Sequence, residues 1–204
     1  MTVPDLDTAH LVALAAALGW ASGVRLYLVV FLTGLAGALG WVTLPPGLHL
    51  LQSPLVLGAS ALLATIEFVA DKVPAVNAFW DGLHTFLRVP GGAILAAGVF
   101  GGDQAQWTLV AALAGGALAA TSHVAKTTTT ASLAVFPEPV THAGVSLVSD
   151  LSVPAMLWLA FAHPAAFAVA LVVILLGMVG VTVVLFRFLR ALTRRLLGRP
   201  GLNS

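Results

Sequence analysis

The chain has 204 residues, of which 59% are hydrophobic and 8% are charged, and its formal net charge is +1. Its mean hydropathy is +1.02, whereas about 25% of the residues of an ordinary soluble domain are charged. These values exclude a soluble globular protein and predict an integral membrane protein built from apolar helices. The chain contains no cysteine, which excludes disulfides, thiolate metal sites and cysteine nucleophiles.

The first apolar segment, over 9–38, is longer than the roughly 20 residues that a membrane span needs. Arg25 lies near its middle, where a charge costs at least about 2.5 kcal/mol on insertion scales. We therefore expect a buried acid or a polar cavity to receive Arg25. The alternative is a break at Arg25 that divides the segment into two shorter helices. Gly19 and Gly23 form a GxxxG pair, which favours the close approach of another helix.

The segment 41–54 contains a Pro-Pro-Gly run, which predicts a loop or an interfacial turn. A second span is predicted over 55–72. Its end carries Glu67 and Asp71, whose i, i+4 spacing places both carboxylates on one helix face, followed by Lys72. Because like charges repel, we expect a proton, a cation or a base of this chain to compensate them.

The segment 77–88 predicts an amphipathic helix, because Asp81, His84 and Arg88 fall on one polar stripe. The stripe either faces water and lipid headgroups at the membrane surface or turns inward towards the acids of the preceding span. A Pro-Gly-Gly run follows. The residues 77–100 therefore form either one kinked span or an interfacial helix and a re-entrant half-helix.

Three further spans are predicted over 105–126, 141–162 and 164–187. His123 and Lys126 share a helix face near the end of the first of these spans. Asp150 lies in an uncharged part of the second span and is interpreted as an intramembrane ionisable site. The third span is uncharged until it reaches the basic C-terminal tail, and we expect it to face lipid.

This pattern predicts an all-α fold: a polytopic transmembrane helix bundle of about six spans with broken or re-entrant helices, in a single integral membrane domain over 1–204. Halves at 9–100 and 104–190 would have opposite orientations, so two inverted three-helix halves are one arrangement that the count allows. The tail at 187–204 holds five of the nine bases and is expected in the cytoplasm by the positive-inside rule. Six spans would place the N-terminus there as well.

One run of the sequence resembles a known family. Residues 66–93, IEFVADKVPAVNAFWDGLHTFLRVPGGA, resemble the signature of domain-of-unknown-function family 4126, a family of bacterial membrane proteins. Similar motifs are GVR at 23–25, SHVAK at 122–126, PEP at 137–139 and the Ser149-Asp150 pair. Asn77 departs from the pattern, since similar sequences have Asp there. The resemblance implies a polytopic bacterial inner-membrane protein and brings no known activity with it.

The charged residues at membrane depth suggest the function, because such residues usually face a bundle interior and mark ion or proton pathways. We predict a transporter or channel for a small ion or polar solute, with His84 and His123 suited to proton coupling. The first alternative is an intramembrane enzyme or binding protein acting on a lipid phosphate, which Arg25, Arg88 and Lys126 would hold. In that alternative His84 or His123 would act as the acid–base group. The second is a structural or partner-binding membrane protein. The predicted pathway residues are Arg25, Glu67, Asp71, Lys72, Asp81, His84, Arg88, His123, Lys126 and Asp150.

The sequence offers little for catalysis or metal binding. His142, Ser146 and Asp150 share one helix face without a nucleophile elbow, so we reject a catalytic triad. Asp81 and His84 alone are too few ligands for a metal. We therefore predict no catalytic residues, metal or cofactor. The expected partners are membrane lipids and a small ion or polar solute, not nucleic acid, and a homo-oligomer is compatible with the sequence.

Overall fold

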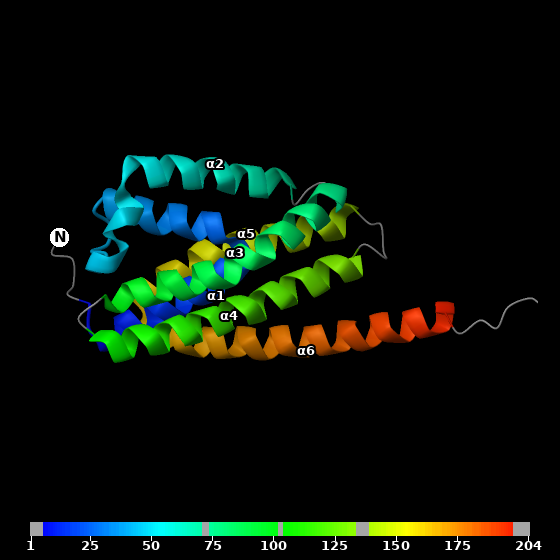
Figure 1. Cartoon of the computed structure of the whole chain (residues 1–204). Helices are drawn as coiled ribbons and strands as arrows, with labels where there is room; N and C mark the ends of the chain where they lie inside the picture. Colours follow the sequence, from blue (N-terminus) through cyan, green and yellow to red (C-terminus); the bar gives the residue numbers. More distant parts are fainter. Residues whose placement is uncertain (1–5, 71–73, 102–103, 134–138, 198–204) are drawn as a thin grey trace, which may run out of the picture.

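The computed structural model describes residues 6–70, 74–101, 104–133 and 139–197. Within these ranges every regular element is a helix and there is no strand. The helices run back and forth along one direction (Figure 1). Their bounds are α1 Thr8–Ala38, the 3-10 helix η1 Pro46–Gln52, α2 Pro54–Ala70, α3 Pro74–Phe100, α4 Ala105–Leu133, α5 Pro139–Ala162 and α6 Pro164–Leu197.

The six predicted spans correspond to α1–α6, which confirms the all-α bundle. Three helices, α1, α4 and α6, are long and apolar enough to cross a membrane among the described residues, and the bent pair of η1 and α2, which meet at 69°, adds a fourth. The helix α3 is continuous from Pro74 to Phe100 and contains Pro90. For 77–100 the structure has one continuous helix without a break at Pro90, and its most apolar part is Phe86–Phe100.

The helix α1 is broken at Arg25, whose backbone angles are φ −150° and ψ 85°. A straight helix of 31 residues would separate its ends by about 46 Å. Instead, His10 near its start and Ala36 near its end line the same cavity. The chain therefore turns back at Arg25, as the two-helix alternative predicts, and Arg25 sits at the tip of a helical hairpin.

This hairpin changes the topology expected from six simple spans. Both ends of α1 lie at the same end of the bundle, and the five helices that follow alternate in direction (Figure 1). The start of α1 and the end of α6 therefore lie at opposite ends of the bundle. The expectation that both termini share one side is wrong for this structure, because α1 passes through the bundle twice. An inverted repeat gains no support either, since α1, the first helix of one half, turns back at Arg25, whereas α4, the first helix of the other half, has no such break.

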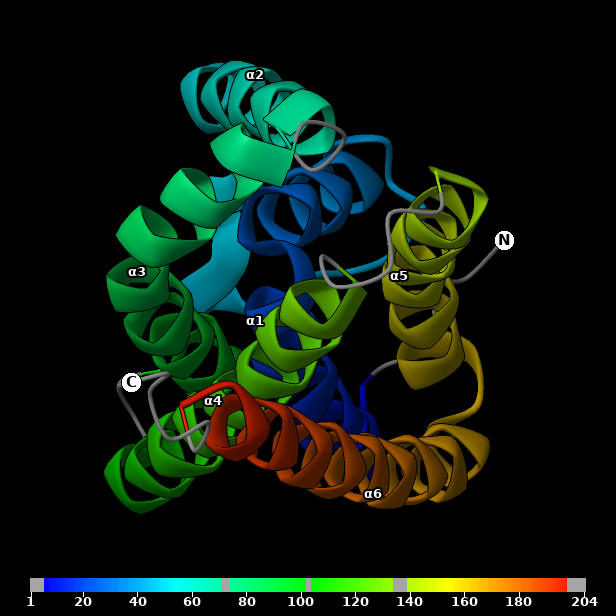
Figure 2. The same cartoon turned by 90° about the vertical axis from the view of Figure 1, so that its right-hand side faces the viewer.

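The hairpin α1 lies in the centre of the bundle, with α2–α6 arranged around it (Figure 2). Glycines let three helices approach closely: a Cβ on Gly19 would meet the backbone of Gly115, and a Cβ on Gly92 would meet the side chain of Ala119. A Cβ on Gly23 would collide with the carbonyl of Ala119 and the hydroxyl of Ser122. The GxxxG pair of α1 therefore packs against α4, as small residues at helix contacts predict.

The outermost helix is α6, of whose most apolar stretch only 6% is buried. Its exposed residues include Val169, Val173, Leu176 and Val184. A wide apolar surface of this kind would be unstable in water. It agrees with the expectation that this span faces lipid.

The glycine contact between α1 and α4 predicts a specific sensitivity. We expect Gly23→Ala to destabilise the fold by about 1–3 kcal/mol, the usual cost of overpacking a core, because backbone atoms of α4 cannot move away easily. Gly58→Ala is the matched control, since nothing lies within 4 Å of a Cβ there, and it should not destabilise the fold. Thermal unfolding in detergent measures both. Equal midpoints for the two variants would show that the close contact does not form.

Candidate functional site

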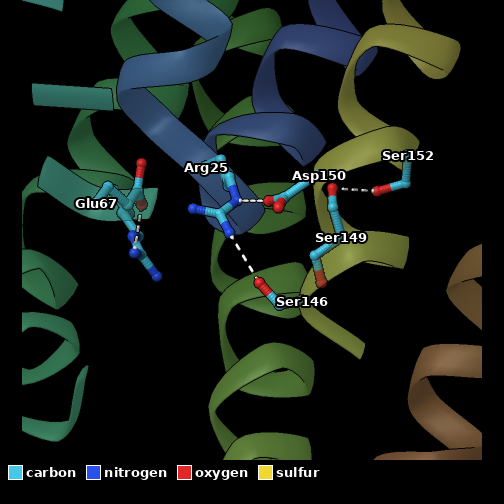
Figure 3. A network of polar contacts seen from close by, with 7 residues as sticks. Arg25, Glu67, Ser146, Ser149, Asp150 and Ser152 are labelled. Atoms are coloured by element: carbon cyan, nitrogen blue, oxygen red, sulfur yellow. Dashed lines mark hydrogen bonds and ion pairs between the residues drawn. The ribbon is translucent and has the colours of Figure 1, made fainter. Parts of the chain in front are cut away.

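Arg25 forms an ion pair with Asp150 at the tip of the α1 hairpin. The Arg25 Nε contacts the Asp150 Oδ1, and the two side chains are 2% and 16% exposed. The Arg25 Nη2 also lies 3.4 Å from the hydroxyl of Ser146, one turn before Asp150 on α5. Figure 3 shows Arg25 pointing towards both residues. The acid that the sequence analysis requires for Arg25 is therefore Asp150.

A second ion pair lies between α2 and α3. The Arg88 Nη2 donates to the Glu67 Oε1 at 2.7 Å, and both side chains are 1% exposed. The Arg88 Nη1 lies 3.1 Å from the Nδ1 of His123 on α4. Because an arginine can only donate, this contact requires an unprotonated Nδ1 on His123, which places the ring proton of a neutral imidazole on Nε2.

The two ion pairs belong to one cluster. The guanidinium carbon of Arg25 lies 5.9 Å from the ring centre of Phe68, the residue next to Glu67. On the hairpin, Tyr27 makes an edge contact of 5.5 Å with the ring of His84, one turn before Arg88 on α3. Figure 3 shows Glu67 and Asp150 on opposite sides of Arg25. We call Arg25, Glu67, His84, Arg88, His123 and Asp150 the charge network.

The charge network lies deep inside the bundle. Glu67 follows the start of α2 by 13 residues, and Asp150 precedes the end of α5 by 12 residues. At 1.5 Å per residue both lie about 18–20 Å from the same end of the bundle. The hydrocarbon layer of a membrane is about 30 Å thick. These ionised groups therefore sit inside an apolar environment, where only pairing makes their charge tolerable.

A comparison with known families now identifies the chain. The family model described as Domain of unknown function (DUF4126) matches residues 12–184. The chain belongs to this family. The match runs from the first turns of α1 into α6, which confirms the resemblance seen in the sequence. No curated protein and no solved structure matches the chain. The apolar helices make this family member an integral membrane protein.

The structure unites six of the ten predicted pathway residues in this DUF4126 protein. Lys126 is partly buried on α4, about one turn after His123. Asp81 lies on α3, but its side chain is outside the described residues, as are Asp71 and Lys72 altogether. The inward arrangement of the α3 stripe holds for His84 and Arg88, which are 5% and 1% exposed.

Sequence reasoning missed Tyr27 and Phe68 as neighbours of the charges, and it missed the contact of Ser146 with Arg25. Tyr27 is the only tyrosine of the chain and lies two residues from Arg25. A polar phenol in an apolar segment could have indicated that Tyr27 lies near the buried charges. Ser146 was visible as a polar residue one turn from Asp150. Phe68 carried no signal, because an aromatic residue in a span is more often exposed to lipid.

The side chains of the charge network can exchange protons and can change their ion-pair partners. In the ranges that the structure covers, no group of three or more His, Asp or Glu side chains could hold a metal ion. Carboxylates and an imidazole can each take up a proton, whereas the two guanidiniums remain charged. A change in protonation would therefore alter which partner each arginine binds.

The Glu67–Arg88 pair predicts strongly non-additive effects of substitution. Removing one partner of a buried ion pair leaves an uncompensated charge and costs about 3–5 kcal/mol. We therefore expect Glu67→Gln to destabilise the protein by about this amount, and Glu67→Gln combined with Arg88→Gln to be more stable than Glu67→Gln alone. Thermal unfolding of wild type, Glu67→Gln, Arg88→Gln and the double variant in detergent measures the coupling. Additive losses would contradict a direct pair.

Proposed function

We propose that this protein is a transporter or channel for a small ion or polar solute in the bacterial inner membrane, coupled to protons. The observation that carries the proposal is the charge network: two buried ion pairs and a histidine, supplied by five helices inside an apolar bundle. Ionisable residues at this depth mark substrate and proton pathways. The break of α1 beside them supports the proposal, since transporters form their sites with discontinuous helices.

The network suggests how protons would be coupled. A proton taken up by Glu67 removes the charge that holds Arg88, and the unprotonated Nδ1 of His123 is then the acceptor that stays beside the guanidinium. A released Arg88 can then bind an anionic or polar solute until Glu67 loses its proton. Arg88 would thus alternate between its ion pair with Glu67 and its contact with the solute. This alternation would couple solute movement to proton movement.

A structural role is the second candidate, and the same contacts favour it. Both guanidiniums are paired with carboxylates, so the network could serve only to lock five helices together. Replacing such pairs by well-packed apolar residues often leaves stability unchanged or improved. Buried ionic pairs are therefore a poor device for stability alone, and we prefer transport. The lipid-phosphate enzyme has weaker support, because the arginines it needs are already engaged by acids.

Proton flux tests the proposal directly. Purified protein in liposomes that enclose a pH-sensitive dye should dissipate an imposed pH gradient when a permeant counter-ion is present. Glu67→Gln should reduce the initial rate by about tenfold or more, since a positioned proton carrier typically contributes at least this much. Thr65→Val on the same helix is the matched control, because its hydroxyl only bonds its own helix at Ala61, and it should retain the rate.

Because Glu67→Gln could unfold the protein, its elution from size exclusion is compared with wild type, and Asp150→Asn provides an independent variant. The wild-type protein could move no proton under any tested gradient of sodium, potassium or chloride. That result would contradict transport and leave a structural role for the charge network. Equal proton flux through wild type and both variants would show that the carboxylates of Glu67 and Asp150 do not take part in proton movement.

Tryptophans and bases support an orientation in the membrane. The exposed tryptophans Trp41, Trp107 and Trp158 lie beside the end of α1, the start of α4 and the end of α5. These helix ends all lie at one end of the bundle (Figure 1). Interfacial tryptophans mark a membrane surface, and arginines mark the cytoplasmic side. The end of α6, with Arg187 and Arg190, lies at the opposite end, and we assign that end to the cytoplasm.

The hairpin predicts termini on opposite sides of the membrane. A fluorescent protein fused at the C-terminus should fluoresce, because that side is cytoplasmic, whereas alkaline phosphatase should be active only when fused at the N-terminus behind an export signal. The controls exchange the two reporters: the fluorescent protein at the N-terminus should not fluoresce, and alkaline phosphatase at the C-terminus should be inactive. Two termini on the same side would mean that α1 crosses the membrane once and that the turn at Arg25 does not form.

A further inference from the structure

A cavity of about 600 Å³ lies at the tryptophan end of the bundle, away from the charge network. Its walls come from both ends of the α1 hairpin, the residues 41–43 and the last turns of α5. They are mostly apolar and include Leu32, Leu157, Trp158 and Phe161. The volume is typical of sites that bury a small organic molecule. The ion or polar solute of the proposed transport function would gain little from such walls.

The floor of the cavity holds an unusual hydroxyl. Thr33 lines the cavity and is 1% exposed, and its hydroxyl has no hydrogen-bond partner in the described part of the chain. A helical threonine normally donates to the carbonyl four residues earlier, as Thr121 does to Ala117 and Thr129 does to Ala125. A buried hydroxyl without a partner is costly. An acceptor brought by a ligand would satisfy it.

The mouth of the cavity has a polar side chain with an acid beside it. His10 lines it, and the Nδ1 of His10 lies 2.8 Å from the Oδ1 of Asp7, whose side chain is 67% exposed. The backbone N–H and ring of His10 hold the pKa of Asp7 below its ordinary value, so this carboxylate stays ionised. Trp41 and Trp158, which line the cavity, are mostly exposed and place its mouth at the membrane surface.

We propose that this cavity binds one zwitterionic diacyl phospholipid with an ammonium headgroup. The ammonium lies beside the Asp7 carboxylate at the mouth, and an acyl chain fills the apolar walls. An ester carbonyl between them accepts the hydrogen bond of the Thr33 hydroxyl. Thr33 lies five residues before the end of α1, about 7.5 Å below the mouth, where the ester groups of a lipid follow its headgroup. The proposal is independent of transport.

Ester and ether lipids test the Thr33 contact. Native mass spectrometry of the purified full chain, titrated with dioleoyl phosphatidylethanolamine or its dialkyl ether analogue, gives both affinities. The wild type should bind the ester lipid about fivefold more tightly, as one neutral hydrogen bond allows. Thr33→Val, which keeps the shape and removes the hydroxyl, should abolish this preference. Thr33→Ser should keep it, and Thr65→Val, outside the cavity, should leave it unchanged.

A second pair of variants tests the cavity without relying on Thr33. Ala162→Phe fills space in the lining and should abolish lipid retention, whereas Ala168→Phe on the exposed face of α6 should not. Equal wild-type affinity for ester and ether lipids would overturn the assignment of the carbonyl. Unchanged binding to Ala162→Phe would overturn the cavity as the site. Oleate binding as tightly as the phospholipid would overturn the headgroup assignment.

Discussion

The burial of Arg25 is the constraint on which the structure depends. A guanidinium that is 1% exposed inside an apolar bundle is tolerable only with a fixed counter-charge. Asp150 supplies it, and the contact fixes the tip of the α1 hairpin against α5. Because α1 turns back at this residue, its second half can reach η1 and α2, and the bundle acquires its central element. The same residue therefore sets the position of the charge, the break in the helix and the sidedness of the termini.

Glycines determine how the remaining charges meet. Gly92 lies one turn from Arg88 on α3, and Ala119 lies one turn from His123 on α4. A Cβ on Gly92 would touch that of Ala119, so the two helices approach almost to backbone contact beside the site. At this separation Arg88 can reach both Glu67 and His123. Close packing of small residues is also the main source of helix association in lipid, where the hydrophobic effect between helices is absent. Stability and site geometry thus depend on the same few positions.

The sequence predicted the helices well and their pairing incompletely. Apolar length and Pro-Gly breaks located all six helices, since a membrane span has a strong one-dimensional signal. The need of Arg25 for an acid was also predictable. The choice of Asp150 was not, because 125 residues separate the two and only the packing of α5 on the hairpin brings them together. The turn at Arg25 escaped a firm prediction for a related reason: no proline marks it, and the break is stabilised by tertiary contacts. The cavity had no sequence signal, because its lining residues are ordinary apolar ones.

Two helices, α1 and α5, contribute residues to both the cavity and the charge network. Lipid binding in the cavity would therefore be linked to the protonation of the network. The second half of α1 carries Arg25 at one end and Thr33 nearer the other, and α5 carries Asp150 one turn before Pro154, which lines the cavity. The lipid proposed for the cavity would bridge these two helices and favour the arrangement in which Arg25 and Asp150 are paired. Thermodynamic linkage makes the effect reciprocal: protonation of Asp150 must weaken lipid binding by the same factor by which the lipid opposes that protonation. The proposed lipid at one membrane surface would thereby influence the proposed proton exchange through α1 and α5, which contribute to both sites.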